Sequence, residues 1–478
     1  MTRLLTIGLE IHIKLKSKTK IFCQCENQQN FETLLPNTHV CPVCTGQPGA
    51  LPVLTQDALR KSLLIGKALN CTINKISSFD RKSYFYPDLP MGYQITQLYH
   101  PTNTNWRVSF FLNNFTEEKS VGILDAHLEC DTAKMIHNGG EAMIDFNRAG
   151  TPLVEVVTGP DFSSSDEVVE FLKELQRIVR YNDIADADLE KGQMRVDVNI
   201  SIRKSLDAPL GTRVEIKNMN SFSAIKRAIE NEQARQTEIY ETNADFFQQT
   251  RRRDDSKGES FLMRSKEDAL DYRYFPEPDL PALILDEKIL NELDKQTLEI
   301  PYTTIKIFKE QYGFNKEFIN GLIWDKTTLD YFLARENINP RTAAKWICGP
   351  IAARRTENFA EISELAFTPK QFDTFLQIAA KWEILESQLK VIMDEMIATG
   401  KDADLIIKEK WFDAPAINTE EINQIIDTVL LENPSIVEQY KGGKTTTIWF
   451  FVGQVMKKTW GKINPQTAAS LVEAKLSN

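Results

Sequence analysis

Residues 5–15 read Leu-Thr-Ile-Gly-Leu-Glu-Ile-His-Ile-Lys-Leu, an unbroken alternation of apolar side chains with small or polar ones. Successive side chains of a β-strand point to opposite faces of a sheet, so this stretch predicts a strand with one fully apolar face. The other face carries Glu10 and His12 side by side. Such a strand needs a packed layer on one side and leaves ionisable groups on the other.

The same alternation returns in three further segments. Their polar faces carry His127, Glu129 and Asp131 in residues 122–131, Arg195, Asp197, Asn199 and Ser201 in residues 194–202, and Arg213, Glu215 and Lys217 in residues 213–217. The Gly-containing loop before the last segment predicts that it pairs with the preceding strand as a hairpin.

If these faces meet, several carboxylates share one cavity and need a counter-ion. Mg²⁺ prefers carboxylate oxygens together with waters and substrate phosphates, so the pattern points to phosphoryl chemistry. Half-buried antiparallel sheets also carry polar residues on an ordinary wet face. Periodicity alone leaves both interpretations open.

Four of the seven cysteines fall in one short window, as Cys23-Gln-Cys25 and Cys41-Pro-Val-Cys44. Such pairs are typical of a tetrahedral zinc site, because each pair can place two sulfurs on one metal. We therefore expect Cys23, Cys25, Cys41 and Cys44 to hold a structural Zn²⁺ without a catalytic role. Ordinary thiols, the alternative, would not explain the clustering. The remaining three, Cys71, Cys130 and Cys348, are expected to act as small hydrophobic side chains.

The chain has 478 residues, of which 42% are hydrophobic and 26% charged, which predicts two or three globular domains. A net charge of −10 argues against a surface that grips nucleic acid everywhere, although it allows a local basic patch. We find no apolar run of about 20 residues and no signal pattern. These features favour a cytoplasmic protein without a membrane segment.

The predicted secondary structure changes along the chain. Strand-like segments with Gly and Pro punctuation continue to about Pro281, and helical spacing follows. We expect an α+β protein: a large domain built on antiparallel sheet over residues 1–293, an α-helical domain over 294–400 and a small helical tail over 401–478. Within the first part, Ser164 with Glu167 and, later, Ser221 mark the starts of two packing helices.

Several common motifs are missing. The sequence has no GxxxxGK[ST] phosphate loop, no GxGxxG opening a helix after a strand, and no GxSxG elbow. Any ATP site must therefore be of a less common kind.

Long blocks of this sequence resemble the B subunit of the tRNA-dependent amidotransferases, the GatB family. They occur in the family's order over essentially the whole chain: Ile7-Gly-Leu-Glu-Ile-His12, Cys41-Pro-Val-Cys-Thr-Gly-Gln-Pro-Gly-Ala-Leu-Pro52, Asp80-Arg-Lys-Ser-Tyr-Phe-Tyr-Pro-Asp-Leu-Pro90, Asn147-Arg-Ala-Gly-Thr-Pro152, Thr212-Arg-Val-Glu-Ile-Lys-Asn218, Met263-Arg-Ser-Lys-Glu267, Asp271-Tyr-Arg-Tyr-Phe-Pro-Glu-Pro-Asp-Leu-Pro281 and Val452-Gly-Gln-Val-Met-Lys457.

The resemblance implies a cradle-shaped catalytic domain, a helical domain and a tail that contacts tRNA. It implies a ligase that uses ATP and Mg²⁺ to phosphorylate the side-chain carboxylate of Asp-tRNA(Asn) or Glu-tRNA(Gln). Ammonia then displaces the phosphate, giving Asn-tRNA(Asn) or Gln-tRNA(Gln). The implied partners are a glutaminase, the A subunit, which releases the ammonia, and a small C subunit, in a heterotrimer with misacylated tRNA as substrate.

The family's metal and nucleotide pocket falls on the polar strand faces described above. The resemblance thus assigns the metal shell to Glu10, His12, Glu129, Asp197 and Glu215, with Lys217 beside it. It assigns phosphate or substrate contacts to Lys82, Tyr84, Tyr86, Lys217, Arg264 and Lys266.

Two departures from the family stand out. Cys130, in Leu128-Glu-Cys-Asp-Thr-Ala-Lys134, replaces an acid that many members carry, although periodicity points it away from Glu129. Thr250-Arg-Arg-Arg-Asp254 lacks an aromatic residue that members often have there.

From Lys441 onward the sequence is basic. Lys441, Lys444, Lys457, Lys458, Lys462 and Lys475 are opposed within this segment only by Glu473. Lysines of this kind contact phosphate without reading bases, so we expect the tail to anchor tRNA. A solvated helix face is the alternative.

Two other functions also fit the sequence. One is an independent ATP-dependent carboxylate ligase that uses free ammonia, and the other is a tRNA-binding subunit without chemistry of its own.

Overall fold

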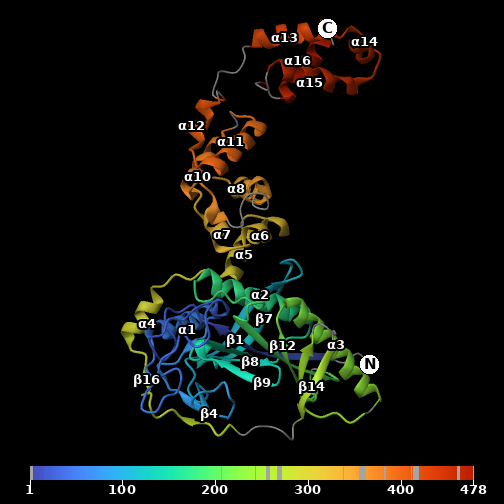
Figure 1. The fold of residues 1–478 in the computed structure, drawn as a ribbon. Coiled ribbons are helices and arrows are strands. Elements are labelled where there is room, and N and C mark those ends of the chain that lie inside the picture. The colour runs from blue at the N-terminus through green and yellow to red at the C-terminus, as the bar shows by residue number, and fades with distance from the viewer. Residues whose placement is uncertain are drawn as a thin grey trace. The chain divides into compact units, whose positions relative to one another are not determined.

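The computed structural model describes residues 4–205, 207–242, 244–254, 259–265, 272–336, 338–354, 362–381, 384–410, 412, 419–459, 463 and 465–476. The chain divides into two compact units, residues 1–316 and 317–478, each with its own contacts. Figure 1 shows their elements. The further division at residues 293 and 400 stays a prediction.

The first unit is rich in strands. They are β1 (Leu4–Lys14), β2 (Thr72–Ile73), β3 (Ile76–Ser77), β4 (Asp80–Ser83), β5 (Tyr93–Thr96), β6 (Asn103–Leu112), β7 (Glu117–Cys130), β8 (Lys134–Asn138), β9 (Glu141–Asp145), β10 (Pro152–Thr158), β11 (Met194–Arg203), β12 (Val214–Met219), β13 (Gln249–Asp254), β14 (Glu259–Ser265), β15 (Phe275–Pro276) and β16 (Leu283–Ile284). Its helices are η1 (Phe31–Thr33), α1 (Gln56–Ala68), η2 (Phe146–Arg148), α2 (Ser165–Tyr181), α3 (Phe222–Thr242), α4 (Glu287–Asp294) and α5 (Pro301–Glu310).

One large sheet organises this unit. Among the described residues nine strands pair in the order β14-β13-β12-β11-β1-β10-β7-β6-β2, with β1 in the middle. All neighbours in this sheet are antiparallel except β12 and β13, which are parallel. The predicted pairing of the two segments now seen as β11 and β12 is confirmed. The fold is α+β with a predominantly antiparallel sheet, as the sequence predicted.

The apolar face of β1 lies in the hydrophobic core. Ile7, Ile11 and Ile13 are fully buried, and they belong to a core cluster that also includes side chains of α1, α2 and α3. These helices pack against the strands of the large sheet, which they cover in Figure 1. Since β-strand side chains alternate, burial of this face turns the polar residues of β1 to the opposite side of the sheet.

Helix α2 begins at the predicted cap, with one difference. The Ser164 hydroxyl accepts a hydrogen bond from the Glu167 amide, as in a capping box. The Glu167 carboxylate, however, accepts from the amide and hydroxyl of Ser163 instead of returning to Ser164. The helix buries Val168, Phe171, Leu172, Leu175, Ile178 and Val179, the stripe that the periodicity indicates. Ser221, which directly precedes α3, likewise accepts a hydrogen bond through its hydroxyl from the Ala224 amide.

The second unit is helical in the part that the structure describes. Its helices are α6 (Lys316–Leu322), α7 (Lys326–Leu333), α8 (Pro340–Trp346), η4 (Ile347–Ile351), η5 (Ile362–Glu364), α10 (Pro369–Ala380), α11 (Glu386–Thr399), α12 (Ala403–Glu409), α13 (Thr419–Glu432), α14 (Pro434–Lys441), η6 (Thr445–Thr447), α15 (Ile448–Lys458) and α16 (Pro465–Leu476). Helices α13, α15 and α16 share a separate hydrophobic core that includes Ile426, Phe451 and Val472. Over the described residues, we find no helix with the length and apolar character needed to span a bilayer.

We predict that Ile11→Ala destabilises the first unit strongly. Ile11 is fully buried in the central strand, so its truncation should lower the free energy of unfolding by about 2–5 kcal/mol. Ile76→Ala is a matched control, because that side chain is 66% exposed and its loss should change stability by about 0.5 kcal/mol or less. Urea unfolding of both variants measures the difference, and equal effects would contradict the assignment of β1 to the core.

Candidate functional site

The four predicted polar faces lie on β7, β1, β11 and β12 of the large sheet, in which β10 lies between β7 and β1. The register sets Glu10 of β1 opposite Asp197 of β11, and His12 opposite Glu155 of β10. The condition that the faces must meet is therefore fulfilled. Glu155 had not been singled out from the sequence.

The first group of acids, here called the acid cluster, consists of Glu10, Asp197 and Glu215. One carboxylate oxygen of each lies within 4.8 Å of the others, which is close enough for one cation to contact all three. The pKa of Glu10 is raised, first by burial and then by repulsion from other acids, including Glu155 and Glu215. Carboxylates this close together repel one another when all are charged. A hard divalent cation, which prefers oxygen ligands, suits such a site.

Lys217 partly neutralises the acid cluster. Its Nζ lies 2.5 Å from Asp197 Oδ2 and 3.0 Å from Glu215 Oε1. Burial disfavours the charged lysine, but the two carboxylates outweigh burial and raise the pKa of Lys217 above its ordinary value. Thr250 donates to Glu215 and thereby fixes the orientation of that carboxylate. A positively charged ammonium group therefore contacts two of the three acids of the cluster.

The second group, here called the histidine cluster, consists of His12, Glu129 and Glu155. His12 Nε2 lies 3.2 Å from Glu129 Oε1 and 3.5 Å from Glu155 Oε2. Burial opposes protonation of His12, but attraction to Glu129 and Glu155 outweighs it and raises the pKa of His12 well above its ordinary value. One imidazole and two carboxylates within 4.8 Å of one another form a second set of possible metal ligands.

A further imidazole supports the histidine cluster from β7. His127 Nδ1 lies 2.6 Å from Asp125 Oδ1, and His127 Nε2 lies 3.4 Å from Glu155 Oε2. Burial disfavours the charged form of His127, but Asp125 and Glu155 raise its pKa. The two histidines together hold the pKa of Glu155 well below its ordinary value against the effect of burial. Glu155 is thus fixed as a carboxylate between two imidazoles.

Sequence reasoning missed Glu155 although a signal was present. In β10, Val154 and Val156 are buried in the core, so alternation places Glu155 on the polar face. It is a lone acid in an otherwise apolar strand, and only the strand order shows that β10 lies between β1 and β7.

The residues expected to contact phosphate or substrate do not all lie in one place. Lys82 lies over the Tyr272 ring, and Glu129 raises its pKa against burial, so Lys82 belongs to the surroundings of the histidine cluster. Burial and nearby acids, Asp88 first, raise the pKa of Tyr84. Tyr86 is 54% exposed and lines a different hollow with Phe85, Pro87 and Met91.

Two further candidates lie in or beside β14. Arg264 pairs through its backbone with Thr250 of β13. Its side chain and all of Lys266 lie outside the described residues.

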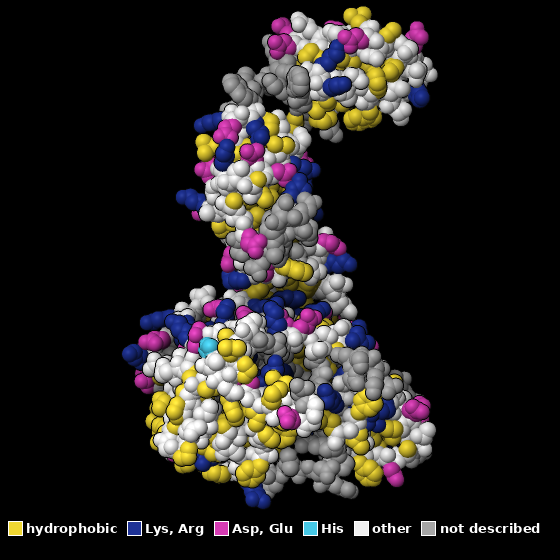
Figure 2. Space-filling model, in the orientation of Figure 1, with side chains coloured by type: hydrophobic (Ala, Val, Ile, Leu, Met, Phe, Trp, Pro, Cys, Tyr) yellow, Lys and Arg dark blue, Asp and Glu magenta, His cyan; other side chains and the backbone are white. Residues whose placement is uncertain are grey.

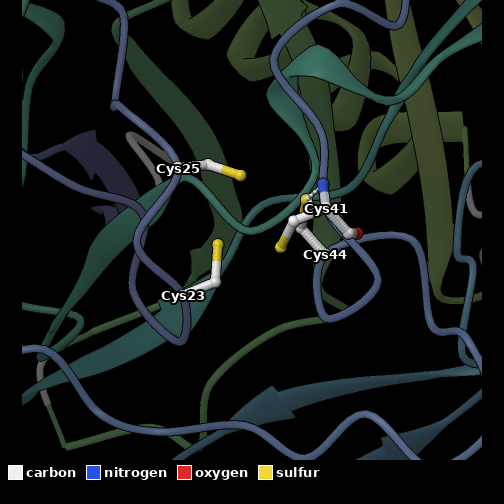
Figure 3. Close-up of side chains that lie close together, drawn as sticks. All are labelled: Cys23, Cys25, Cys41 and Cys44. Carbon is white, nitrogen blue, oxygen red and sulfur yellow. Dashed lines mark hydrogen bonds between the residues drawn. The ribbon is translucent and has the colours of Figure 1, made fainter.

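The four predicted cysteines come together. The sulfur atoms of Cys23, Cys25, Cys41 and Cys44 all lie within 4.8 Å of one another. Figure 3 shows the side chains directed to a common space. Tetrahedral Zn–S bonds of about 2.3 Å separate sulfurs by roughly 3.8 Å, so this arrangement fits one zinc ion after small adjustments.

A buried lysine adjoins the four-cysteine site. Lys20 is fully buried, and its Nζ donates to the His39 carbonyl at 2.8 Å and lies 3.5 Å from Cys44 Sγ. Contacts with Cys23, the Cys41 amide and Lys20 favour the thiolate and lower the pKa of Cys44. The lysine therefore offsets part of the negative charge that four thiolates would carry.

Cys130 lies in the hydrophobic core, 5% exposed, on the face of β7 opposite Glu129. The prediction that it points away from Glu129 is confirmed. Its replacement of a family acid therefore removes no carboxylate from the histidine cluster.

The fold and the site define an α+β protein with two candidate cation sites on one face of a predominantly antiparallel sheet and a four-cysteine site in the same unit. Residues 5–291 match the family described as GatB/GatE catalytic domain, and residues 331–476 match the family described as GatB domain. The chain belongs to the GatB family.

Relatives share the full length of the chain. It is 40% identical over 474 residues to the B subunit of the aspartyl/glutamyl-tRNA(Asn/Gln) amidotransferase of Thermoanaerobacter pseudethanolicus. It is 39% identical over 478 residues to the protein of that name from Carboxydothermus hydrogenoformans, and 39% identical over 470 residues to that from Persephonella marina. Each alignment covers 98% of both chains.

We predict about one zinc per chain, bound by the four cysteines, as measured by elemental analysis. Cys23→Ser or Cys44→Ser should lower the metal content and the thermal stability without a selective effect on turnover, because a closed thiolate site contributes to folding. Cys71→Ser, in the same unit but outside the cluster, should keep the metal. A metal-free protein of full stability would contradict the prediction.

Proposed function

We propose that this chain is the tRNA-binding, ATP-using subunit of an aspartyl/glutamyl-tRNA amidotransferase. It would activate the side-chain carboxylate of Asp-tRNA(Asn), Glu-tRNA(Gln) or both and convert it to an amide. The relatives carry this activity in their names. The observation in this chain that supports it most is the pair of adjoining clusters, acid and histidine, on one open sheet face beside Lys217.

The reaction has two chemical steps. A carboxylate resists attack by ammonia, because its oxygen is a poor leaving group. In the first step a carboxylate oxygen of the aminoacyl group attacks the γ-phosphorus of ATP, and ADP leaves. In the second, ammonia attacks the carbonyl carbon, phosphate leaves, and the nitrogen loses a proton.

The residues of this chain fit the first step by position and charge. The acid cluster and the histidine cluster would each hold a divalent cation, which supplies charge neutralisation for the phosphates. Lys217 and Lys82 add permanent positive charges at the edges of the two clusters. Phosphoryl transfer asks little covalent chemistry of the protein, so holding and neutralising the reactants is the main task.

The second step needs ammonia from elsewhere. The sequence has no GxSxG elbow. Following the family resemblance, we propose a glutaminase, the A subunit, as the ammonia source and a small C subunit as the third member of a heterotrimer. The relatives are named as B subunits, which supports a complex of several subunits. Such a complex would act where tRNA is aminoacylated, in the cytoplasm.

One experiment separates this proposal from the two alternatives. ATP cleavage by the purified chain and by its complex is measured with misacylated tRNA, with and without glutamine and the glutaminase. We expect cleavage that depends on misacylated tRNA, and amide formation that depends on the glutaminase and glutamine. Amidation by the chain alone with free ammonia and no tRNA would identify an independent ligase. Binding of tRNA without ATP cleavage would identify a binding subunit.

We predict that Glu10→Gln or Glu129→Gln abolishes phosphoryl transfer while folding and tRNA binding stay nearly intact. Each removes a charge directed at a cation, and neither removes a core contact. Glu155→Gln should act in the same way, because Glu155 joins both histidines. Glu141→Gln, an exposed acid of β9, is the control. Near-normal transamidation with glutamine and ATP in Glu10→Gln or Glu129→Gln would refute the assignment.

The structure adds two acids from outside the segment to the charge balance of the tail. Lys458 pairs with Glu432 at 2.7 Å, and Lys475 with Asp427 at 2.6 Å. Both acids belong to α13, which precedes the segment in which Glu473 was counted as the only acid. Acidic and basic side chains are interspersed on these helices in Figure 2. Lys462 lies outside the described residues, so the proposed tRNA contact rests on Lys441, Lys444 and Lys457.

We predict that deleting residues from about Asp402 onward raises the KM for tRNA and flattens the salt dependence of binding, while glutaminase activity of the complex is spared. Each lost phosphate contact should reduce the slope of log affinity against log salt by about 0.7–0.9.

Point variants sharpen the test. Lys441→Ala with Lys444→Ala should weaken tRNA binding more than Lys475→Ala, whose charge Asp427 already neutralises. Unchanged tRNA affinity across a salt titration after the deletion would show that the tail is not the anchor.

A further inference from the structure

Arg195 lies next to the histidine cluster on the polar face of the sheet. In the antiparallel pair of β1 and β11 it stands directly opposite His12. Side chains that face each other in such a pair have Cβ atoms about 4.5–5.5 Å apart. Asp131 does most to raise the pKa of Arg195, and Glu129 of the histidine cluster and Asp197 of the acid cluster raise it further. The guanidinium group therefore lies within electrostatic reach of both clusters.

A buried carboxylate holds Arg195 in place. Arg195 Nη2 lies 2.5 Å from Asp131 Oδ2, and the Asp131 side chain is only 6% exposed. Asp131 is fixed in turn, because its Oδ1 accepts from the Thr132 amide at 2.9 Å and its Oδ2 lies 3.5 Å from Arg148 Nε. Burial disfavours the charged acid, but Arg195 and Arg148 outweigh burial and lower the pKa of Asp131. One nitrogen of Arg195 is thus anchored to an ordered acid.

The rest of the guanidinium group is open. Within the part of the chain that the structure describes, Asp131 is the sole acceptor that Arg195 contacts, and Nε and Nη1 of Arg195 donate to none. The Arg195 side chain is 45% exposed, so a ligand can reach it. Arg148 already lies beside Asp131, so that acid has a second counter-ion. An arginine that is held at one nitrogen and open at two others is arranged to bind an anion.

Other cations near the two clusters use their donors on the protein. Lys217 contacts two acids of the acid cluster. Lys14 is 7% exposed and donates to two backbone carbonyl oxygens, and Arg148 donates through Nε and Nη2 to two others. Lys82 lies over an aromatic ring and offers a compact charge without a planar fork. Arg195 is the planar cation that this face presents to an incoming ligand.

The chemistry of the face selects the kind of anion. The two clusters hold five carboxylates, which repel a further carboxylate unless a cation lies beside it. Phosphates would be held by the divalent cations proposed for the clusters, whereas the side chain of the aminoacyl group needs a contact of its own. A guanidinium group matches the planar shape of a carboxylate and forms charge-assisted hydrogen bonds with it.

We propose that Arg195 binds the side-chain carboxylate of the aminoacyl group, with Asp131 as its positioning residue, and so places this carboxylate beside the histidine cluster. The proposal rests on the proposed function, whose substrate carries such a carboxylate. It also gives the complex a way to tell substrate from product. The product amide is neutral, so it forms no charge-assisted hydrogen bond with Arg195 and is released more readily.

The experiment compares ligands that differ only in this group. Equilibrium binding to the full complex, without ATP, is measured for the aspartyl and asparaginyl forms of tRNA(Asn) and for the glutamyl and glutaminyl forms of tRNA(Gln). Binding of ATP with Mg²⁺ is measured separately. The variants are Arg195→Lys and Arg195→Gln. Arg107→Lys is the matched control, because Arg107 is 58% exposed and also pairs with an acid, Asp161, but lies on β6 outside the clusters.

The wild-type complex should bind the acidic form of its tRNA about 10-fold or more tightly than the amide form. Arg195→Lys should raise the Kd for the acidic form about 10-fold, the loss expected for one hydrogen bond to a charged group, and leave the Kd values for the amide form and for ATP unchanged. Arg195→Gln should abolish the preference for the acidic form. Arg107→Lys should change none of these values.

Three results would overturn the proposal. The first is a wild-type complex without a preference for the acidic form, or variants that keep the wild-type preference. The second is an equal loss of affinity for the acidic and amide forms, which would show a structural role or a contact with the tRNA backbone. The third is a raised Kd for ATP with an unchanged preference, which would assign the guanidinium group to phosphate. Arg195→Lys decides the matter if Arg195→Gln fails to fold, because it keeps a positive charge beside Asp131.

Failure of the proposed function has a different signature. A complex that prefers the acidic form of tRNA through Arg195, but never cleaves ATP in its presence, would refute the proposed function and leave the carboxylate contact standing.

Discussion

The strict alternation of side chains along β1 is the constraint on which the rest of the first unit depends. This strand lies between β10 and β11, with Ile7, Ile11 and Ile13 in the core and Glu10 and His12 on the open face. A register shift of one residue would place three ionisable groups, those of Glu10, His12 and Lys14, in the core. Burial of the isoleucines stabilises one register of β1. The same register determines where Glu10 and His12 meet the ionisable groups of the neighbouring strands.

Carboxylates lie close together on the open face of the sheet, and their negative charge is balanced in two different ways. In the acid cluster a permanent cation, Lys217, bridges Asp197 and Glu215. In the histidine cluster the balancing groups are imidazoles, which lose their charge when they bind a metal. The two neighbouring sites thus differ in how readily a cation can replace the positive charge already present.

Much of this arrangement could be read from the sequence, because alternation is a local property. It identified Glu10, His12, Glu129, Asp197 and Glu215 as residues of polar faces, and the apolar direction of Cys130. Strand order is not local. Glu155 stands alone in an apolar strand, and only the placement of β10 between β1 and β7 gives it two histidine neighbours. The pairing of Lys458 and Lys475 with acids of α13 was hidden for the same reason.

The burial of Lys20 beside the four cysteines limits how this part of the sequence can change in evolution. A lysine without solvent exposure needs partners for its charge, since an isolated buried charge costs several kcal/mol. The partners of Lys20 are the His39 carbonyl oxygen and the sulfur of Cys44, of which only the sulfur can carry a negative charge. In a lineage that loses the four cysteines, a lysine at this position destabilises the fold and should be replaced by an uncharged side chain. The five residues should therefore be inherited or abandoned as one unit, which the aligned sequences of distant relatives would record.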